Sequence, residues 1–112
     1  IVFDGEDPHV VLGAPGGTQI AMGVTSVVLN VLDHGMTMTE AVSAPRFSAT
    51  SDAIDVTNRI PRYVTEELEA QGYEVIRSPF TYGIAAVHGI RIVDGKCDGG
   101  ADPGHDGVAL TV

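Results

Sequence analysis

The sequence has no tryptophan, and aromatic residues make up only 5% of its 112 residues. A core must therefore be built from Val, Ile, Leu, Ala and Met, for which the 44% hydrophobic content is sufficient. The single cysteine, Cys97, excludes an internal disulfide. Basic residues are scarce, and the formal net charge is -9. This balance argues against nucleic acid or an anionic membrane surface as a partner, because both would repel the chain.

Long hydrophobic runs are also absent. The longest apolar stretch, Ile20 to Leu32, is shorter than the roughly 20 residues of a membrane-spanning helix. No signal-peptide pattern is found, and the compartment stays open between cytoplasm and periplasm. The length predicts a single domain over 1–112. Because the opening "IVF" is typical of the middle of a strand, we expect a fragment or one chain of a processed protein.

Hydrophobic periodicity and turn signals predict strands and helices that alternate along the chain. The order is typical of a layered α/β or α+β domain. We expect strands at 1–3 and 9–15, a helix at 18–33, a short helix at 37–43, a strand at 53–57, a helix at 61–72, and strands at 73–78, 83–90, 91–95 and 107–112.

Several boundaries rest on specific residues. Thr37 and Glu40 have the spacing of a capping box, and Gly35 is placed to end the helix before it. The apolar positions of the long helix form one broad stripe that includes Val27, Val31 and Leu32. The first two strands are apolar without alternation, which is typical of strands covered on both faces.

The stretch "GAPGGT", residues 13–18, joins a predicted strand to a predicted helix. Such a turn leaves the first helical amides unpaired, and glycine lets a ligand approach the backbone closely. An anion or a developing oxyanion could bind there, but an ordinary tight turn explains the local sequence equally. Nucleotide motifs are excluded, because neither G-x-x-x-x-G-K-[ST] nor G-x-G-x-x-G fits.

A second candidate is "CDGGADPGHDG", residues 97–107, which combines a thiol, a histidine and three carboxylates. Its spacing matches neither an EF-hand nor a zinc signature, so we favour a loop over a metal site. Arg46 could be a structural ion-pair donor or a carboxylate clamp, and we favour the first. No histidine has a recognisable nucleophile beside it: His9, His34, His88 and His105 are scattered.

Four motifs in the chain carry a family resemblance. In order they are "VVLGAPGGTQI", "VLNVLDHGMTMTEAVSAPRF", "LEAQGYEV" and "GGADPGHDG". Together they resemble the later part of the small subunit of γ-glutamyltransferases, with its L-G-[SA]-P-G-G-[ST] turn, its E-A-x-x-A-P-R segment and its closing A-D-P-R-x-x-G. The resemblance extends from Val2 to about Leu110 and implies part of an N-terminal-nucleophile hydrolase, an α-β-β-α sandwich made by self-cleavage of a precursor.

The resemblance also implies a mechanism. A Thr at the start of the family's small subunit attacks a γ-glutamyl amide such as glutathione and passes the acyl group to water or an amino acceptor. The backbone amides of Gly16 and Gly17 correspond to the family's oxyanion hole, and no cofactor is implied. The Thr, a Ser-Ser pair and an Arg that bind substrate lie upstream of Ile1 in the family. We therefore expect this chain to need the rest of its precursor as a partner.

One departure concerns the closing motif, where Gly104 stands in place of the family's Arg. We expect this change to affect the packing of the tail more than the chemistry. The "GGADP" form resembles γ-glutamyltransferase-like amidohydrolases and acylases, so another acyl amide is an alternative substrate. A non-catalytic acidic α/β interaction module is the alternative from a different class.

Overall fold

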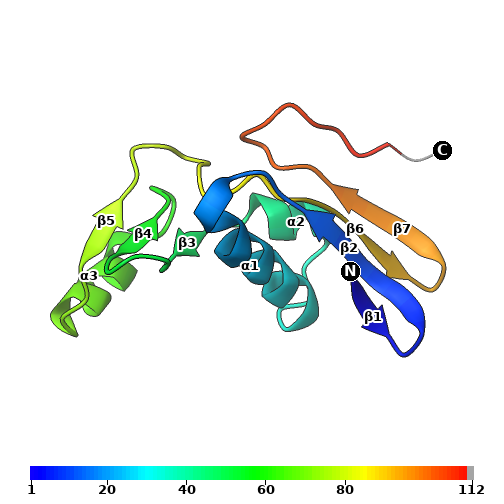
Figure 1. Cartoon of the computed structure of the whole chain (residues 1–112), viewed down its shortest axis with the longest axis horizontal. Coiled ribbons are helices and arrows are strands. Elements are labelled where there is room, and N and C mark those ends of the chain that lie inside the picture. The colour runs from blue at the N-terminus through cyan, green and yellow to red at the C-terminus, as the bar shows by residue number, and fades with distance from the viewer. Residues whose placement is uncertain (111–112) are drawn as a thin grey trace.

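The computed structural model describes residues 1–110 of an elongated molecule measuring 46 × 30 × 24 Å. Figure 1 shows two small sheets at opposite ends, with two helices between them and a C-terminal tail above the larger sheet. The elements are β1 (Val2–Asp4), β2 (Asp7–Gly13), the 3-10 turn η1 (Gly17–Gln19), α1 (Ile20–Leu32), α2 (Met38–Ser43), β3 (Phe47–Ser48), β4 (Ile54–Val56), α3 (Arg62–Ala70), β5 (Val75–Arg77), β6 (His88–Val93) and β7 (Lys96–Gly100). This mixture of helices and sheets confirms the α+β prediction.

The larger sheet is antiparallel in the order β1-β2-β6-β7. Alternation along β2 turns Val10 toward the helices, where it is fully buried, and Val11 toward the opposite face, where it is 37% exposed. Ile90 pairs with Val11 in the register and is also exposed. Within the described residues helices cover one face alone, so coverage of these strands on both faces stays a prediction.

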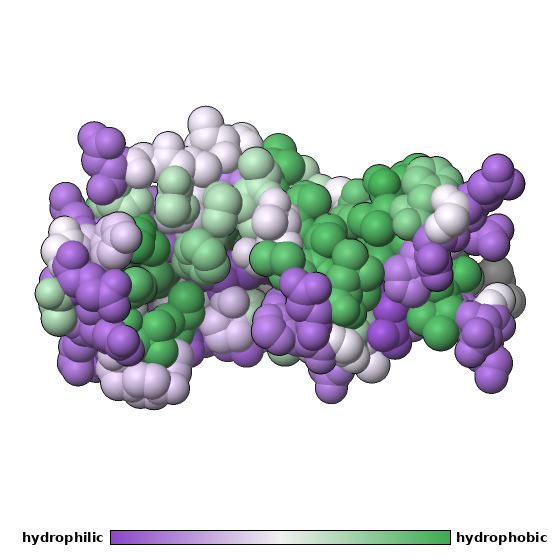
Figure 2. Space-filling model, turned by 90° about the horizontal axis from the view of Figure 1, so that it is seen from below, coloured by the Kyte–Doolittle hydropathy of each residue, from purple (hydrophilic) through white to green (hydrophobic). Residues whose placement is uncertain are grey.

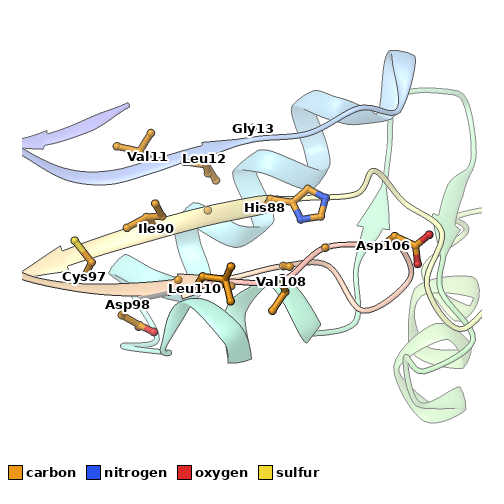
Figure 3. A pocket seen from close by; sticks show the side chains of 16 residues that line it. Val11, Leu12, Gly13, His88, Ile90, Cys97, Asp98, Asp106, Val108 and Leu110 are labelled. Atoms are coloured by element: carbon orange, nitrogen blue, oxygen red, sulfur yellow. The ribbon is translucent and has the colours of Figure 1, made fainter. Parts of the chain in front are cut away.

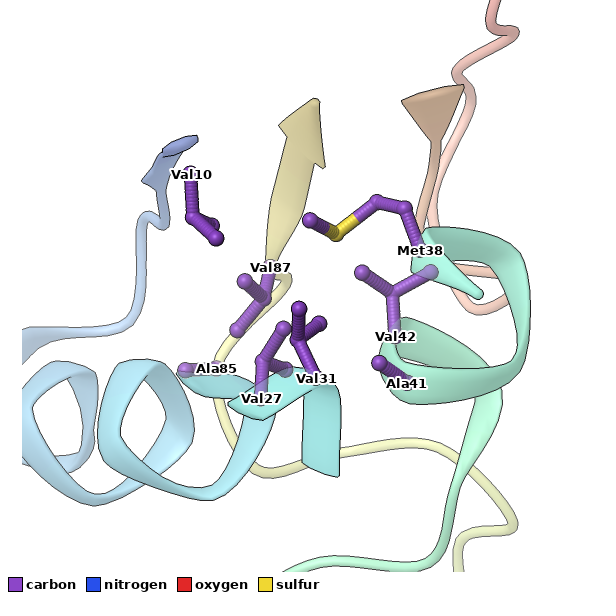
Figure 4. Packing of buried hydrophobic residues seen from close by; sticks show 8 residues of the cluster. All are labelled: Val10, Val27, Val31, Met38, Ala41, Val42, Ala85 and Val87. Atoms are coloured by element: carbon purple, nitrogen blue, oxygen red, sulfur yellow. The ribbon is translucent and has the colours of Figure 1, made fainter. Parts of the chain in front are cut away.

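The main hydrophobic core lies between this sheet and the two helices α1 and α2 (Figure 4). Its buried members are Val10, Val27, Val31, Met38, Ala41, Val42, Ala85 and Val87. The stripe of α1 is centred on Gly23, Val27 and Val31, whereas Leu32 is 45% exposed and lies outside it. Gly100 of β7 lets α2 approach closely, since a Cβ there would lie 2.7 Å from the backbone of Met38.

The connection between the helices has the local chemistry that the sequence predicts. Gly35, at φ 65°, ends the turn after α1, and the N–H of Met36 donates back to the carbonyl of Asn30 at 3.0 Å. The capping box at the start of α2 is complete: the Thr37 side chain accepts the Glu40 N–H, and the Glu40 side chain accepts the Thr37 N–H. These two signals fix how α2 turns back onto the sheet.

The smaller sheet has the order β3-β4-β5, with β4 and β5 parallel. The crossover helix α3 packs near β5 through Arg77, which donates to Thr65 Oγ1 at 2.9 Å and to the carbonyl of Ile60 at 2.7 Å. The predicted helix at 61–72 and strand at 53–57 are confirmed in type and place.

Three predictions in the C-terminal half are wrong. The strands expected at 83–90 and 91–95 are one strand, β6, preceded by an irregular buried segment at 84–87. Residues 96–100, expected largely as loop, form β7 because they pair with β6 in a hairpin. Residues 107–110 of the expected last strand are irregular, and Thr111 and Val112 lie outside the described residues.

Acid should weaken the start of α2. The Thr37 N–H and hydroxyl both donate to Glu40 Oε2 at 2.8 Å, and these bonds lower the pKa of Glu40 below its ordinary 4.5. A carboxyl whose pKa is lower in the folded state than in the unfolded state stabilises the fold at pH values above its unfolded-state pKa. This contribution is lost as the pH falls through the folded-state pKa. Thermal unfolding of wild type and Glu40→Ala should therefore differ more at pH 7 than at pH 3. An equal difference at both values would contradict this role.

Candidate functional site

The glycine turn between β2 and α1 has a backbone that requires glycine at two consecutive positions. Gly16 has φ 142° and Gly17 has φ 62°, both in the region that side chains disfavour. Gly17 begins η1, which leads directly into α1. Among the described residues, the N–H groups of Gly16 and Gly17 have no hydrogen-bond acceptor, and both residues are exposed. The turn thus offers two adjacent free donors at the start of a helix.

The segment at 83–87 holds this turn from behind, which sequence periodicity did not indicate. Ala85 has φ 48°, an uncommon conformation for a residue with a side chain. It is wedged between Gly16 and Gly23: a Cβ on Gly16 would lie 3.0 Å from Ala85 Cα, and one on Gly23 would lie 2.7 Å from Ala85 Cβ. The N–H of Ala86 donates to the carbonyl of Pro15 at 3.2 Å. The only available signal was the run of small residues in "GIAA".

A buried ion pair between Arg46 and Asp102 joins the second and last motifs. Their side chains are 2% and 1% exposed. The backbone at Arg46 is tied to Thr57, whose N–H donates to the Arg46 carbonyl at 3.1 Å. Arg46 Nε and Nη1 are buried without a partner among the described residues. The ion-pair interpretation of Arg46 is confirmed, and the carboxylate-clamp role stays a prediction.

Asp102 lies at the point where these motifs meet. Its second carboxylate oxygen accepts the N–H of Gly104 at 2.8 Å, and its own N–H donates to His88 Nδ1 at 3.3 Å. A pocket of about 140 Å³ is lined by Asp102 together with Pro15, Gly16, Gln19, Gly83, Ala85, Ala86 and His105. The glycine turn, the strained segment and the closing motif therefore share one small pocket.

Gly104 is required by its neighbour Tyr82. A Cβ on Gly104 would lie 2.5 Å from Tyr82 Cβ, which excludes a side chain unless the backbone moves. Arg59 lies over the Tyr82 ring, with Cζ 4.9 Å from the ring centroid. The tail at this point thus packs against Tyr82, whose ring also makes a cation–π contact with Arg59.

The other candidate residues of the closing motif are used elsewhere. Asp98 forms an ion pair with Arg91 at 3.1 Å and accepts the N–H of Met38 at 2.9 Å, while Cys97 is exposed on β7. Within residues 1–110 no three His, Cys, Asp or Glu side chains gather to hold a metal ion. His88 is a half-buried strand residue with a hydrogen-bonded ring, as expected, and His34 is exposed near the end of α1.

A larger pocket of about 1000 Å³ lies between the larger sheet and the tail (Figure 3). A Cβ on Gly99 would meet Ala109 of the tail at 2.9 Å, whereas the adjacent Gly100 meets α2. The tail and the helices therefore lie on opposite faces of the sheet. Val11 and Ile90 contribute to the apolar wall of this larger pocket. None of the helices in the described part of the chain has the length and apolar character required to cross a membrane.

Comparison with known proteins gives a consistent result over the whole length. A sequence model of the family described as gamma-glutamyltranspeptidase matches residues 1–112. The acylase ACY 1 proenzyme of Pseudomonas sp. (strain SE83) is 36% identical over 72 residues, 64% of this chain and 13% of that protein. The glutathione hydrolase proenzyme of Bacillus subtilis (strain 168) is 27% identical over 113 residues, 100% of this chain and 19% of that protein.

The solved structure of gamma-glutamyltranspeptidase from Pseudomonas nitroreducens complexed with L-DON superimposes with a TM-score of 0.87 at 27% identity. The match covers 100% of this chain and 60% of the solved one. The chain thus spans a small part of the curated relatives it matches and more than half of this solved chain.

Breaking the buried pair should be costly. Asp102→Asn leaves the Arg46 charge buried without a counter-ion, and urea unfolding should show a loss of about 3–5 kcal/mol. Arg46→Met combined with Asp102→Asn should recover part of that loss, because the unpaired charge is removed. Asp98→Asn, in the more exposed pair with Arg91, should cost less than about 1 kcal/mol. Equal costs for both Asp variants would contradict the assignment.

Proposed function

Because this chain belongs to the gamma-glutamyltranspeptidase family of N-terminal-nucleophile hydrolases, we propose that it is the C-terminal part of a catalytic domain that cleaves or transfers γ-glutamyl amides such as glutathione. The observation that carries the proposal is the pair of N–H groups at Gly16 and Gly17, which have no acceptor within the described residues, together with the pocket that Gly16 lines. Two free amides at a carbonyl oxygen are the arrangement that acyl transfer needs.

In the proposed reaction, a Thr that the family carries upstream of these residues attacks the scissile carbonyl. The carbonyl oxygen gains a negative charge, and the amides of Gly16 and Gly17 stabilise it. The amide nitrogen leaves as an amine after taking up a proton, and the acyl group stays on the Thr oxygen. Water or an amino acceptor then takes the acyl group. Preorganised donors act mainly on the charge that develops in the transition state, so they affect kcat more than substrate binding.

The open face of the larger sheet supports a partner for this chain. Val11 and Ile90 are exposed side by side on that face, and Val108 and Leu110 of the tail lie over the same pocket. Figure 2, seen from below, shows a further hydrophobic area to the right of the middle, on the side of the molecule away from the tail. We propose that the open sheet face packs against the remainder of the precursor to complete the α-β-β-α sandwich, since monomers rarely expose large apolar patches.

A second candidate substrate class is another acyl amide. The likeness to the acylase ACY 1 proenzyme, 36% identical over 72 residues, supports it beside the glutathione hydrolase proenzymes. The same oxyanion chemistry serves both classes, and the acyl-binding part lies outside these residues. Hydrolysis of γ-glutamyl-p-nitroanilide and of an aliphatic acyl anilide by the processed full-length protein distinguishes them.

Changing the glycine turn should reduce catalysis. Gly17→Ala adds a Cβ in open space but disfavours φ 62°, so the amide is displaced from the oxyanion. We expect kcat for γ-glutamyl-p-nitroanilide to fall about tenfold or more, with little change in KM. Gly5→Ala is the matched control, because Gly5 also has φ 62° and open space but lies in the β1–β2 turn. An unchanged kcat in Gly17→Ala would count against the oxyanion role.

The open sheet face should make the isolated chain associate. Residues 1–112 alone should elute from size-exclusion chromatography with the mass of an oligomer by light scattering, because apolar surface is left uncovered. Ile90→Lys should reduce this association. Ile76→Lys in β5 is the matched control, since Ile76 is 48% exposed and Ile90 is 45% exposed. A wild-type chain that elutes as a monomer would favour a non-catalytic module that folds by itself.

A further inference from the structure

The pocket beside the glycine turn has a wall formed mostly by small residues and backbone. Three of the residues that line it have polar side chains: Gln19, Asp102 and His105. Its volume of about 140 Å³ is that of about five water molecules, so it accommodates a small group and not a whole peptide. Any such group would lie next to Gly16.

Asp102 has no free carboxylate oxygen to offer a ligand. One oxygen is paired with Arg46, and the other accepts the N–H of Gly104 at 2.8 Å. Its charge is also neutralised by Arg46 within the protein. The side chains of Gln19 and His105 make no hydrogen bond within the described residues. These two are therefore the groups that a ligand can engage.

His105 has a fixed backbone but a free ring. Its N–H donates to the carbonyl of Asp102 at 3.2 Å, which closes a turn, and the Asp102 carboxylate braces the same turn at Gly104. The buried pair with Arg46 anchors that turn to the rest of the fold. His105 itself is exposed, whereas Asp102, Ala85 and Ala86 form the buried wall. The imidazole therefore lies at the open rim of the pocket.

The position at the rim indicates which part of a substrate the ring meets. In the proposed reaction, the acyl group stays bound until deacylation, and the part of the protein that holds it lies outside these residues. The amine leaves to solvent and an acceptor enters from it, so both pass the rim. An imidazole N–H can donate to a carboxylate whether the ring is neutral or charged.

We propose that His105 determines specificity by hydrogen-bonding a carboxylate on the leaving amine or acceptor, as an amino acid or short peptide carries. This inference rests on the proposed function. Gln19, which lines the same pocket, is the second donor available to that carboxylate.

The test compares two substrates on the processed full-length protein. Glutathione releases an amine that carries a carboxylate, whereas γ-glutamyl-p-nitroanilide releases one that does not. In His105→Ala, the ratio of KM for glutathione to KM for the anilide should rise about fivefold, the effect of one hydrogen bond, with the kcat ratio unchanged. His105→Gln keeps an N–H donor and should restore part of the ratio.

Asp106→Asn is the control, because Asp106 is the next residue of the tail and does not line this pocket. It should leave the KM ratio as in wild type. If His105→Ala changes KM for both substrates equally, or changes neither, the inference is overturned while the proposed function stands. A wild-type protein that cleaves neither substrate overturns the proposed function and this inference with it.

Discussion

The buried pair of Arg46 and Asp102 is the interaction on which the arrangement of the site depends. A charge enclosed at 1–2% exposure is tolerated only with a counter-ion, so the two segments must meet. Asp102 then fixes the turn at Gly104 and binds His88 at the start of β6. Through β6 the pair is joined to the core, and through the pocket it borders Gly16. One ion pair thus anchors the closing motif, which shares a pocket with the glycine turn.

Small residues make these close approaches possible. Gly16 and Gly23 accept Ala85 between them, and Gly100 accepts the backbone of α2. Ala85 adopts a positive φ in this position, and such backbone strain is retained where the surrounding structure enforces it. The turn is consequently held by van der Waals contact with Ala85, while the N–H groups of Gly16 and Gly17 have no acceptor within the described residues.

Much of this could be predicted from local sequence signals. The capping box and the Gly35 helix end are set by neighbouring residues, and both were predicted. β7 was missed because "KCDGG" has turn composition and becomes a strand only by pairing with β6. The segment at 84–87 was mistaken for a strand because its burial comes from tertiary packing. The shared pocket could not be predicted, since it joins residues far apart in sequence, although the resemblance pointed to Gly16 and Gly17.

The spacing of the ion pair has a consequence for the order of events during synthesis. Arg46 and Asp102 are separated by 56 positions, and β2 must wait for β6 before it gains its second neighbour. The glycine turn leaves the ribosome before the segment and the carboxylate that hold it. Chains are made at about 5–20 residues per second, so a nascent chain spends seconds with an incomplete site. The pocket can therefore form only after all the residues that line it, from Pro15 to His105, have been synthesised.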